Sequence, residues 1–296
     1  MSELSEAKLK NLEIAKAAIW ENRKIKVRVF FKNKLAVTGL ILVLIMIIIA
    51  LLAPIIFPEG PLVMDTANRF KSPSVKHLFG TDEFGRDILN RTMYGIRISL
   101  VIGFFTALIT FILGMILGLL AGYFSFLDNI IMRICEGMMA IPSILMGIAL
   151  MSALGSNSKN VVIALSIVYT PVVARIARAA TLTVKEMIYI EAIKSQGAGW
   201  IRIVFMHIAP NTLSPVIVQA TNIFATAIIL EAALSFLGAG IPAPLPSMGN
   251  ILSEAKQYIF NSWWLALFPS IVMILLVMGI NIFGDGIRDV LDPSSN

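Results

Sequence analysis

Few side chains in this 296-residue sequence could do chemistry, and their types exclude most kinds of it. Two histidines and the single cysteine, Cys135, are too few for a metal cluster or an internal disulfide framework. The sequence contains no G-x-x-x-x-G-K-S/T phosphate loop, and neither histidine has a convincing partner for a Ser/His/Asp set. We therefore expect no metal, no cofactor and no catalysis in this chain.

A few charged residues interrupt otherwise apolar stretches. Glu231 follows the uncharged residues 211–230 and opens the sequence EAALSFLG, in which Ser235 lies four residues further along. Charges in such surroundings often mark a pathway. Two expectations follow. Glu231 and Ser235 line a polar path or gate, or Glu231 simply reaches the polar interface of the membrane. Arg133 and Glu136 are three residues apart, a spacing that allows pairing on one helix face, and we interpret them as a structural ion pair.

Residues 191–210, EAIKSQGAGWIRIVFMHIAP, are half polar and lie between two long apolar stretches. Apolar residues recur at helical spacing, and the other face is polar: Ile190, Ile193, Ile201 and Val204 against Glu191, Lys194, Gln196 and Arg202. Glycine at 197 permits a sharp turn with backbone angles that other residues avoid. The pattern favours docking on a soluble partner, with Ile201, Val204 and Phe205 filling a groove. The alternative is an interfacial helix lying on lipid.

The composition sets the surroundings of these residues. Of the chain, 57% is hydrophobic and only 14% charged, against about 25% charged in soluble domains. Such a chain has too little polar surface to cover itself in water, so we predict an integral membrane protein. A spanning helix needs about 20 mostly apolar residues. Six segments approach this length: 35–57, 98–127, 137–158 (beginning nearer 129), 161–174 (extended until Arg175 and Arg178 reach the interface), 211–230 and 265–284.

The positions of Lys and Arg predict the orientation. Residues 1–34 hold nine of them and residues 175–210 hold five. Six spans place both segments on one side, which we predict to be cytoplasmic together with both termini. The net charge of +6 thus reflects cytoplasmic loops, not nucleic-acid binding. The N-terminal 34 residues also contain Leu12, Ile19 and Trp20, which favour an amphipathic elbow helix on the membrane surface over a solvated basic tail.

Other features predict how the helices pack and what covers the outer face. Gly114, Gly118 and Gly122 recur every four residues and allow close approach of another helix. Prolines at 142 and 171 are expected to kink their helices. Residues 77–95 and 240–264 are expected to form structured outer caps, with Trp263 and Trp264 as interfacial anchors.

The half-polar segment resembles the EAA loop of ABC importer permeases, whose pattern is E-A-A, three residues, Gly, nine residues and I-x-L-P. Glu191, Ala192, Gly197 and Pro210 occupy matching positions, and Ile193 replaces the second alanine. Four further segments resemble, in the same order, C-type permeases of the dipeptide/oligopeptide/nickel group. They are FGTDEFGRDILNRTMYGIRISL (79–100), EAALSFLG (231–238), PSMGNILSEA (246–255) and NIFGDGIRDVLDP (281–293).

This resemblance implies an all-α integral membrane protein with the type I ABC importer permease fold. Six transmembrane helices would be joined by an N-terminal amphipathic elbow and a cytoplasmic coupling helix. The chain would divide into a basic N-terminal segment (1–34), a first transmembrane helix (35–57), an extracytoplasmic loop (58–96), the transporter transmembrane domain (97–286) and a cytoplasmic tail (287–296).

The resemblance also implies a function and a set of partners. The chain would form half of a peptide pathway in the plasma (inner) membrane with a homologous B-type permease, and an extracytoplasmic binding protein would deliver the peptide. Two ABC ATPase subunits would bind ATP and Mg and dock on the coupling residues, namely Glu191, Ala192, Ile193, Gly197, Gly199, Ile201, Val204, Phe205 and Pro210. The alternatives are a nickel or metal-chelate importer and, from another class, an ion-driven secondary transporter, which would need charges at the membrane midplane.

Overall fold

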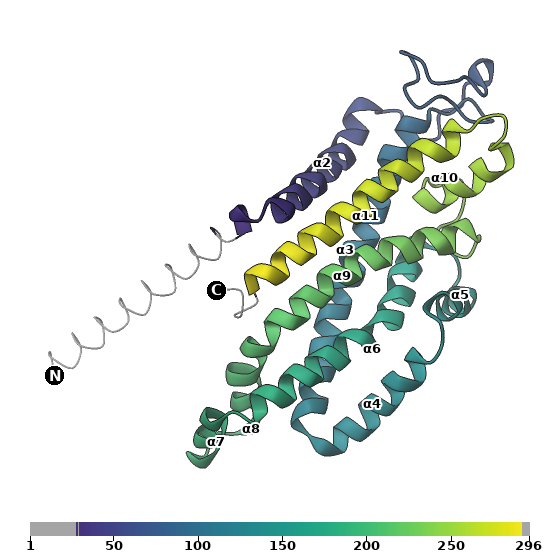
Figure 1. Ribbon diagram of the computed structural model, residues 1–296. Coiled ribbons are helices and arrows are strands. Elements are labelled where there is room, and N and C mark those ends of the chain that lie inside the picture. Colours follow the sequence, from purple (N-terminus) through teal and green to yellow (C-terminus); the bar gives the residue numbers. More distant parts are fainter. Residues whose placement is uncertain (1–27, 29, 292–296) are drawn as a thin grey trace.

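A computed structural model describes residue 28 and residues 30–291, and it is a bundle of long helices with short helices at its ends (Figure 1). The predicted N-terminal elbow falls on residues that lie almost wholly outside this range. The helices are α2 (Lys34–Ile56), α3 (Ile88–Tyr123), α4 (Ser125–Met139), α5 (Ser143–Leu154), α6 (Ser158–Lys185), α7 (Ile188–Ser195), α8 (Trp200–Arg202), α9 (Ala209–Phe236), α10 (Met248–Ala255) and α11 (Trp264–Leu291).

Five helices are long and apolar enough to cross a membrane, and the bent pair α4 and α5 supplies a sixth if it counts as one span. The predicted all-α membrane fold is thereby confirmed, although the third span is not one helix. It breaks before Ser143 and turns by 96°, because Pro142 has no N–H to continue the ladder. Pro171, by contrast, lies inside an α6 that runs on to Lys185.

Two spans are longer than the hydropathy of the sequence predicts. α3 begins at Ile88, where Asp87 accepts a hydrogen bond from the Asn90 backbone N–H (3.0 Å) and caps the helix. α8 and α9 are joined by a π-helical stretch, Ile203–Ile208, into one continuous span, Trp200–Phe236. Residues 200–210 therefore begin the fifth span instead of forming part of a separate short helix.

The glycine stripe of α3 lies against α6. A Cβ on Gly118 would come within 2.7 Å of the Ala174 carbonyl oxygen and 2.8 Å of the Arg178 nitrogen, so only glycine fits there. Gly114 faces Val173 and Gly122 faces Thr181 in the same way. This close approach lets α3 pack behind the row formed by α11, α9 and α6 (Figure 1).

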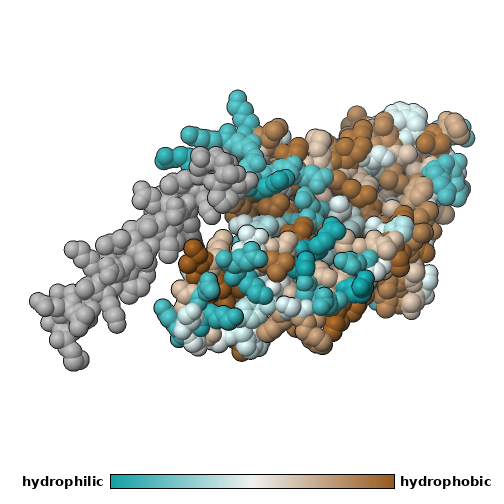
Figure 2. All heavy atoms as spheres, turned by 60° about the horizontal axis from the view of Figure 1, so that its bottom comes forward, coloured by the Kyte–Doolittle hydropathy of each residue, from teal (hydrophilic) through white to brown (hydrophobic). Residues whose placement is uncertain are grey.

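Polar side chains gather at the ends of the bundle and apolar ones along its flanks. Figure 2 brings the end that carries α7 forward, and hydrophilic residues cover much of it. We call this the α7 end, and the opposite end, formed by the loop before α3 together with α10, the cap end. At the cap end Trp264 is only 7% exposed, and its Nε1 donates to the Thr81 carbonyl (3.4 Å). The expected interfacial role is therefore wrong for Trp264, while Trp263 is half exposed.

Candidate functional site

The short helix α7 connects α6 to the fifth span, Trp200–Phe236, and a small number of contacts hold it in place. Ile190, 4% exposed, anchors it in the core cluster that also contains Val184 and Ile203. The Asn211 side chain donates to the Tyr189 hydroxyl (3.2 Å) and to the His207 carbonyl (2.7 Å), which links α7 to the start of the fifth span. A displacement of α7 would therefore be passed directly to that span.

Gly197 ends α7 with the turn that the sequence predicts. Its φ is +83°, in the left-handed region that favours glycine. The Gly197 N–H donates to the Lys194 carbonyl (3.0 Å) and the Ala198 N–H to the Ile193 carbonyl (3.4 Å), the two bonds of a Schellman cap. Gly199 has an ordinary φ of −67° and precedes α8. A Cβ at either glycine would meet nothing within 4 Å.

The predicted coupling residues do not all face outward. Glu191, Ala192, Ile201, Phe205 and Pro210 are exposed, and Ile193 is half buried. Val204, predicted to fill a partner's groove, is fully buried in this chain's own core and cannot reach a partner.

Two large apolar side chains, one just before this segment and one within it, were not identified from the sequence. Ile188 is 85% exposed and Met206 is 69% exposed. The exposed apolar surface of the segment therefore includes Ile188, Trp200, Ile201, Phe205 and Met206. Helical spacing alone does not reveal it, because the turn at Gly197 reorients the second half.

Glu231 lies in neither of its two expected environments. Its side chain is 0% exposed, so it neither reaches an interface nor lines an open path in this conformation. Its carboxylate accepts hydrogen bonds from the Ser99 hydroxyl (3.1 Å) on α3 and the Ser235 hydroxyl (2.9 Å). Ser235 Oγ in turn accepts from the Ile241 N–H (3.1 Å), which ties α3, α9 and the loop before α10 together.

A buried ion cluster at the cap end was not expected from the sequence. Arg91, 1% exposed, donates to Asp82 Oδ2 (2.9 Å) and to both oxygens of Glu254 (2.5 and 3.2 Å), while Arg86 donates to the same two acids. Burial raises the pKa of the neighbouring Glu83 carboxyl above its ordinary value, and its Oε2 lacks a partner. These salt bridges join the loop before α3 to α10.

The expected Arg133–Glu136 ion pair is wrong. Within the described part of the chain, the acidic residue of α4 that forms an ion pair is Asp128. Its carboxylate oxygens accept hydrogen bonds from Nε and Nη2 of Arg178 on α6 (2.6 Å for Nη2). Arg133 and Glu136 are both exposed and make no ion pair or side-chain hydrogen bond there.

Comparison with known proteins identifies the chain's family. Residues 111–296 match the model of the binding-protein-dependent transport system inner membrane component, and residues 24–73 match the N-terminal TM domain of oligopeptide transport permease C.

The similar curated proteins match over most of their length. The chain is 46% identical to the dipeptide transport system permease protein DppC of Alkalihalophilus pseudofirmus, over 88% of this chain and 86% of that protein. It is 40% identical to the di/tripeptide transport system permease protein DppC of Pseudomonas aeruginosa, over 89% of each chain. The glutathione transport system permease protein GsiD of Pectobacterium atrosepticum is also 40% identical, over 90% of this chain and 89% of its own.

A solved structure shares the fold. An inward-facing MetNI methionine ABC transporter chain superposes with a TM-score of 0.56 at 20% identity, over 67% of this chain and 94% of that one. The family match over the C-terminal 186 residues and the identity to the curated permeases settle the class of protein. The chain belongs to the binding-protein-dependent transport system inner membrane component family and is a permease subunit, not an enzyme.

Proposed function

We propose that this chain forms one half of the translocation pathway of an ATP-driven peptide importer, paired with a homologous permease. The observation that carries the proposal is the exposed α7, closed by the Gly197 turn and joined to two spans. Two ATPase subunits dock on this helix and bind ATP and Mg. Their closure moves α7 and rocks the spans between outward- and inward-facing states.

The α7 end faces the cytoplasm in this proposal, and so do both termini. The cap end faces outward in the inner membrane, where an extracytoplasmic binding protein delivers the substrate. The buried ion cluster at the cap end supports this role, because its salt bridges hold the cap together as a docking surface for the binding protein. Its members are Asp82, Arg86, Arg91 and Glu254. The coupling residues are Glu191, Ala192, Ile193, Gly197, Ile201, Phe205 and Pro210, with Val204 holding the segment in place from inside. Gly199 only joins the two parts of the segment, because its φ of −67° suits any residue.

Peptides are favoured over nickel or metal chelates by the names of similar proteins, which specify dipeptides, di/tripeptides and glutathione. Glu231, the candidate gate residue, and Ser235 act here as a buried connection between α3, α9 and the cap. An ion-driven mechanism has no support in the family to which the chain belongs.

The proposal is tested by reconstituting the two permeases in vesicles with and without the ATPases and the binding protein. We expect uptake of a labelled dipeptide only with all components and ATP, and no uptake of ⁶³Ni²⁺. Uptake driven by an ion gradient without the ATPases, or uptake of nickel in place of the dipeptide, would refute it.

A further inference from the structure

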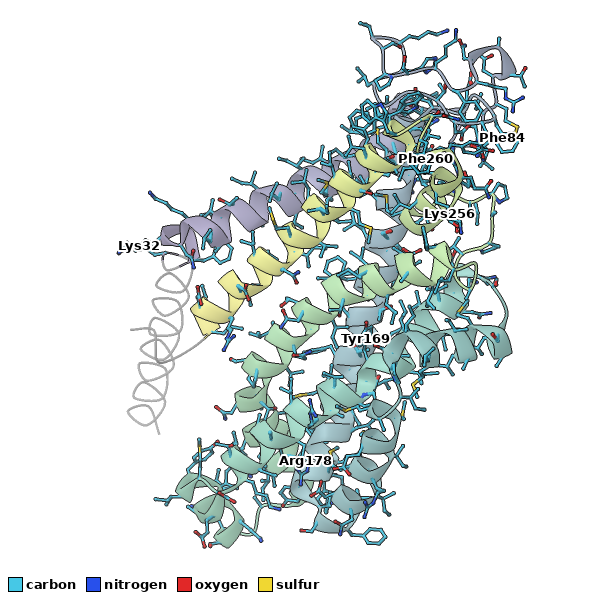
Figure 3. All side chains as sticks on the ribbon, turned by 45° about the vertical axis from the view of Figure 1, so that its right-hand side comes forward. Lys32, Phe84, Tyr169, Arg178, Lys256 and Phe260 are labelled. Carbon is cyan, nitrogen blue, oxygen red and sulfur yellow. The ribbon has the colours of Figure 1, made fainter. Side chains whose placement is uncertain are left out.

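A cavity of about 430 Å³ opens between α4 and α6, in the half of the bundle nearer α7. Arg178, labelled in Figure 3, lies in this half, whereas Lys256 and Phe260 mark the cap end. The lining combines polar, charged and thioether side chains: Asp128, Asn129, Met132, Arg133, Cys135, Glu136, Met139, Arg175 and Arg178. Binding sites for small molecules commonly have volumes of about 300–1,000 Å³.

The charges in this cavity fall into two groups. Arg178 and Asp128 satisfy each other through two hydrogen bonds. Arg133, Arg175 and Glu136 make no ion pair or side-chain hydrogen bond with any other residue that the structure describes. The cavity therefore presents two guanidinium groups and one carboxylate that are in no ion pair, and Glu136 lies near enough to Arg178 to interact with it electrostatically.

Arg175 lies near the inner edge of the membrane. It follows the start of α6 at Ser158 by 17 residues, about 26 Å along the helix at the rise of 1.5 Å per residue, and the hydrocarbon core is about 30 Å thick. Charged side chains at this depth face water, headgroups or protein, so the mouth of the cavity is open to a charged occupant. The adjoining edge of α4 is different, because Phe126, Ile130 and Ile134 are exposed apolar residues.

We propose that this cavity is a transient binding station for a short zwitterionic peptide on its way through the membrane. Arg133 and Arg175 bind the terminal carboxylate, for which guanidinium groups are well suited, and Glu136 binds the terminal ammonium. An anionic lipid headgroup fits less well, because Glu136 would face its phosphate. This inference rests on the proposed peptide transport and adds the residues that hold the peptide.

The first test measures access and protection in the assembled, reconstituted importer. Cys135, the only cysteine in the chain, is replaced (Cys135→Ser), and a cysteine is then introduced by Asn129→Cys in the cavity or Ile134→Cys on the apolar edge. Labelling of this subunit by a charged methanethiosulfonate reagent is followed by mass spectrometry. We expect Asn129→Cys to react, and a dipeptide at millimolar concentration to slow its reaction at least threefold, while Ile134→Cys reacts slowly with or without the peptide. No protection at the cavity position would overturn the proposal.

The second test assigns the charges. Protection is compared between a dipeptide, its C-terminal amide and its N-acetyl form, with Asn129→Cys as reporter. We expect Arg175→Gln to remove only the preference for the dipeptide over its C-terminal amide. We expect Glu136→Gln to remove only the preference for the dipeptide over its N-acetyl form. Loss of permease pairing in either variant, seen by size-exclusion chromatography, would assign the cavity to the permease contact and overturn the station. Protection by anionic lipid instead of peptide would also overturn it. ATP-driven dipeptide uptake without protection would reject the station and leave the proposed function standing.

Discussion

Replacement of Gly197 by valine should uncouple ATP hydrolysis from transport without disassembling the complex. The φ of +83° at Gly197 lies in the left-handed region, which costs an L-residue about 1–2 kcal/mol. A free energy of this size changes a population ratio about 5- to 30-fold. Because an added Cβ meets no atom within 4 Å, the loss falls on the turn that ends α7 and not on packing.

The matched control is Gly199→Val, two residues along the same connection. Gly199 is equally free of neighbours but has a φ of −67°, which valine adopts without strain. Dipeptide uptake and phosphate release are measured on the same vesicles, and their ratio reports coupling. We expect Gly197→Val to lower the peptide transported per ATP at least fivefold and Gly199→Val to change it less than twofold. Equal ratios in the two variants would show that the turn geometry does not matter.

Three further outcomes follow from packing and charge. Gly118→Leu should lower the thermal unfolding midpoint of the solubilised complex, because overpacking between α3 and α6 costs about 1–3 kcal/mol or more. Gly137→Leu on α4, where an added side chain meets nothing, should change the midpoint by no more than about 1–2 °C. Equal losses in the two variants would contradict the assigned contact between α3 and α6. Glu254→Ala leaves two buried arginines short of a partner and should destabilise the complex by up to about 3 kcal/mol; an unchanged midpoint would contradict the cluster's role. Since burial raises the pKa of Glu83 in the fold, stability should fall as pH rises through that pKa, and Glu83→Gln should flatten this slope in a pH series of midpoints. An unaltered slope would show that Glu83 is not the group responsible.

Local spacing in the sequence was enough to predict several features. The four-residue repeat of Gly114, Gly118 and Gly122 predicts a close helix contact, and the structure supplies the partner, α6. The glycine at 197 predicts a turn because few other residues adopt a positive φ. Runs of apolar residues predict the five continuous spans, because a membrane requires about 20 apolar residues per helix, whereas the sixth predicted span is the bent pair α4 and α5.

Features that depend on distant partners could not be predicted in this way. Val204 and Ile201 look alike in the helical pattern, yet one is buried and the other exposed, since the direction of the chain after Gly197 decides between them. Arg91 and Glu254 pair across 163 residues, and Ser99 reaches Glu231 across 132.

A spacing that allows an ion pair does not require one. Arg133 and Glu136 satisfy the spacing, but both are exposed and line the cavity unpaired, while the neighbouring Asp128 on α4 pairs with Arg178 on α6.

The most direct test of the central claim is site-specific photo-crosslinking from α7 in the assembled importer. A benzoylphenylalanine in place of Ile188, which is 85% exposed, should attach to an ATPase subunit with high yield. The same probe in place of Phe260, 97% exposed at the cap end, should not attach to an ATPase. Attachment of the Ile188 probe to lipid alone would contradict the coupling role of α7.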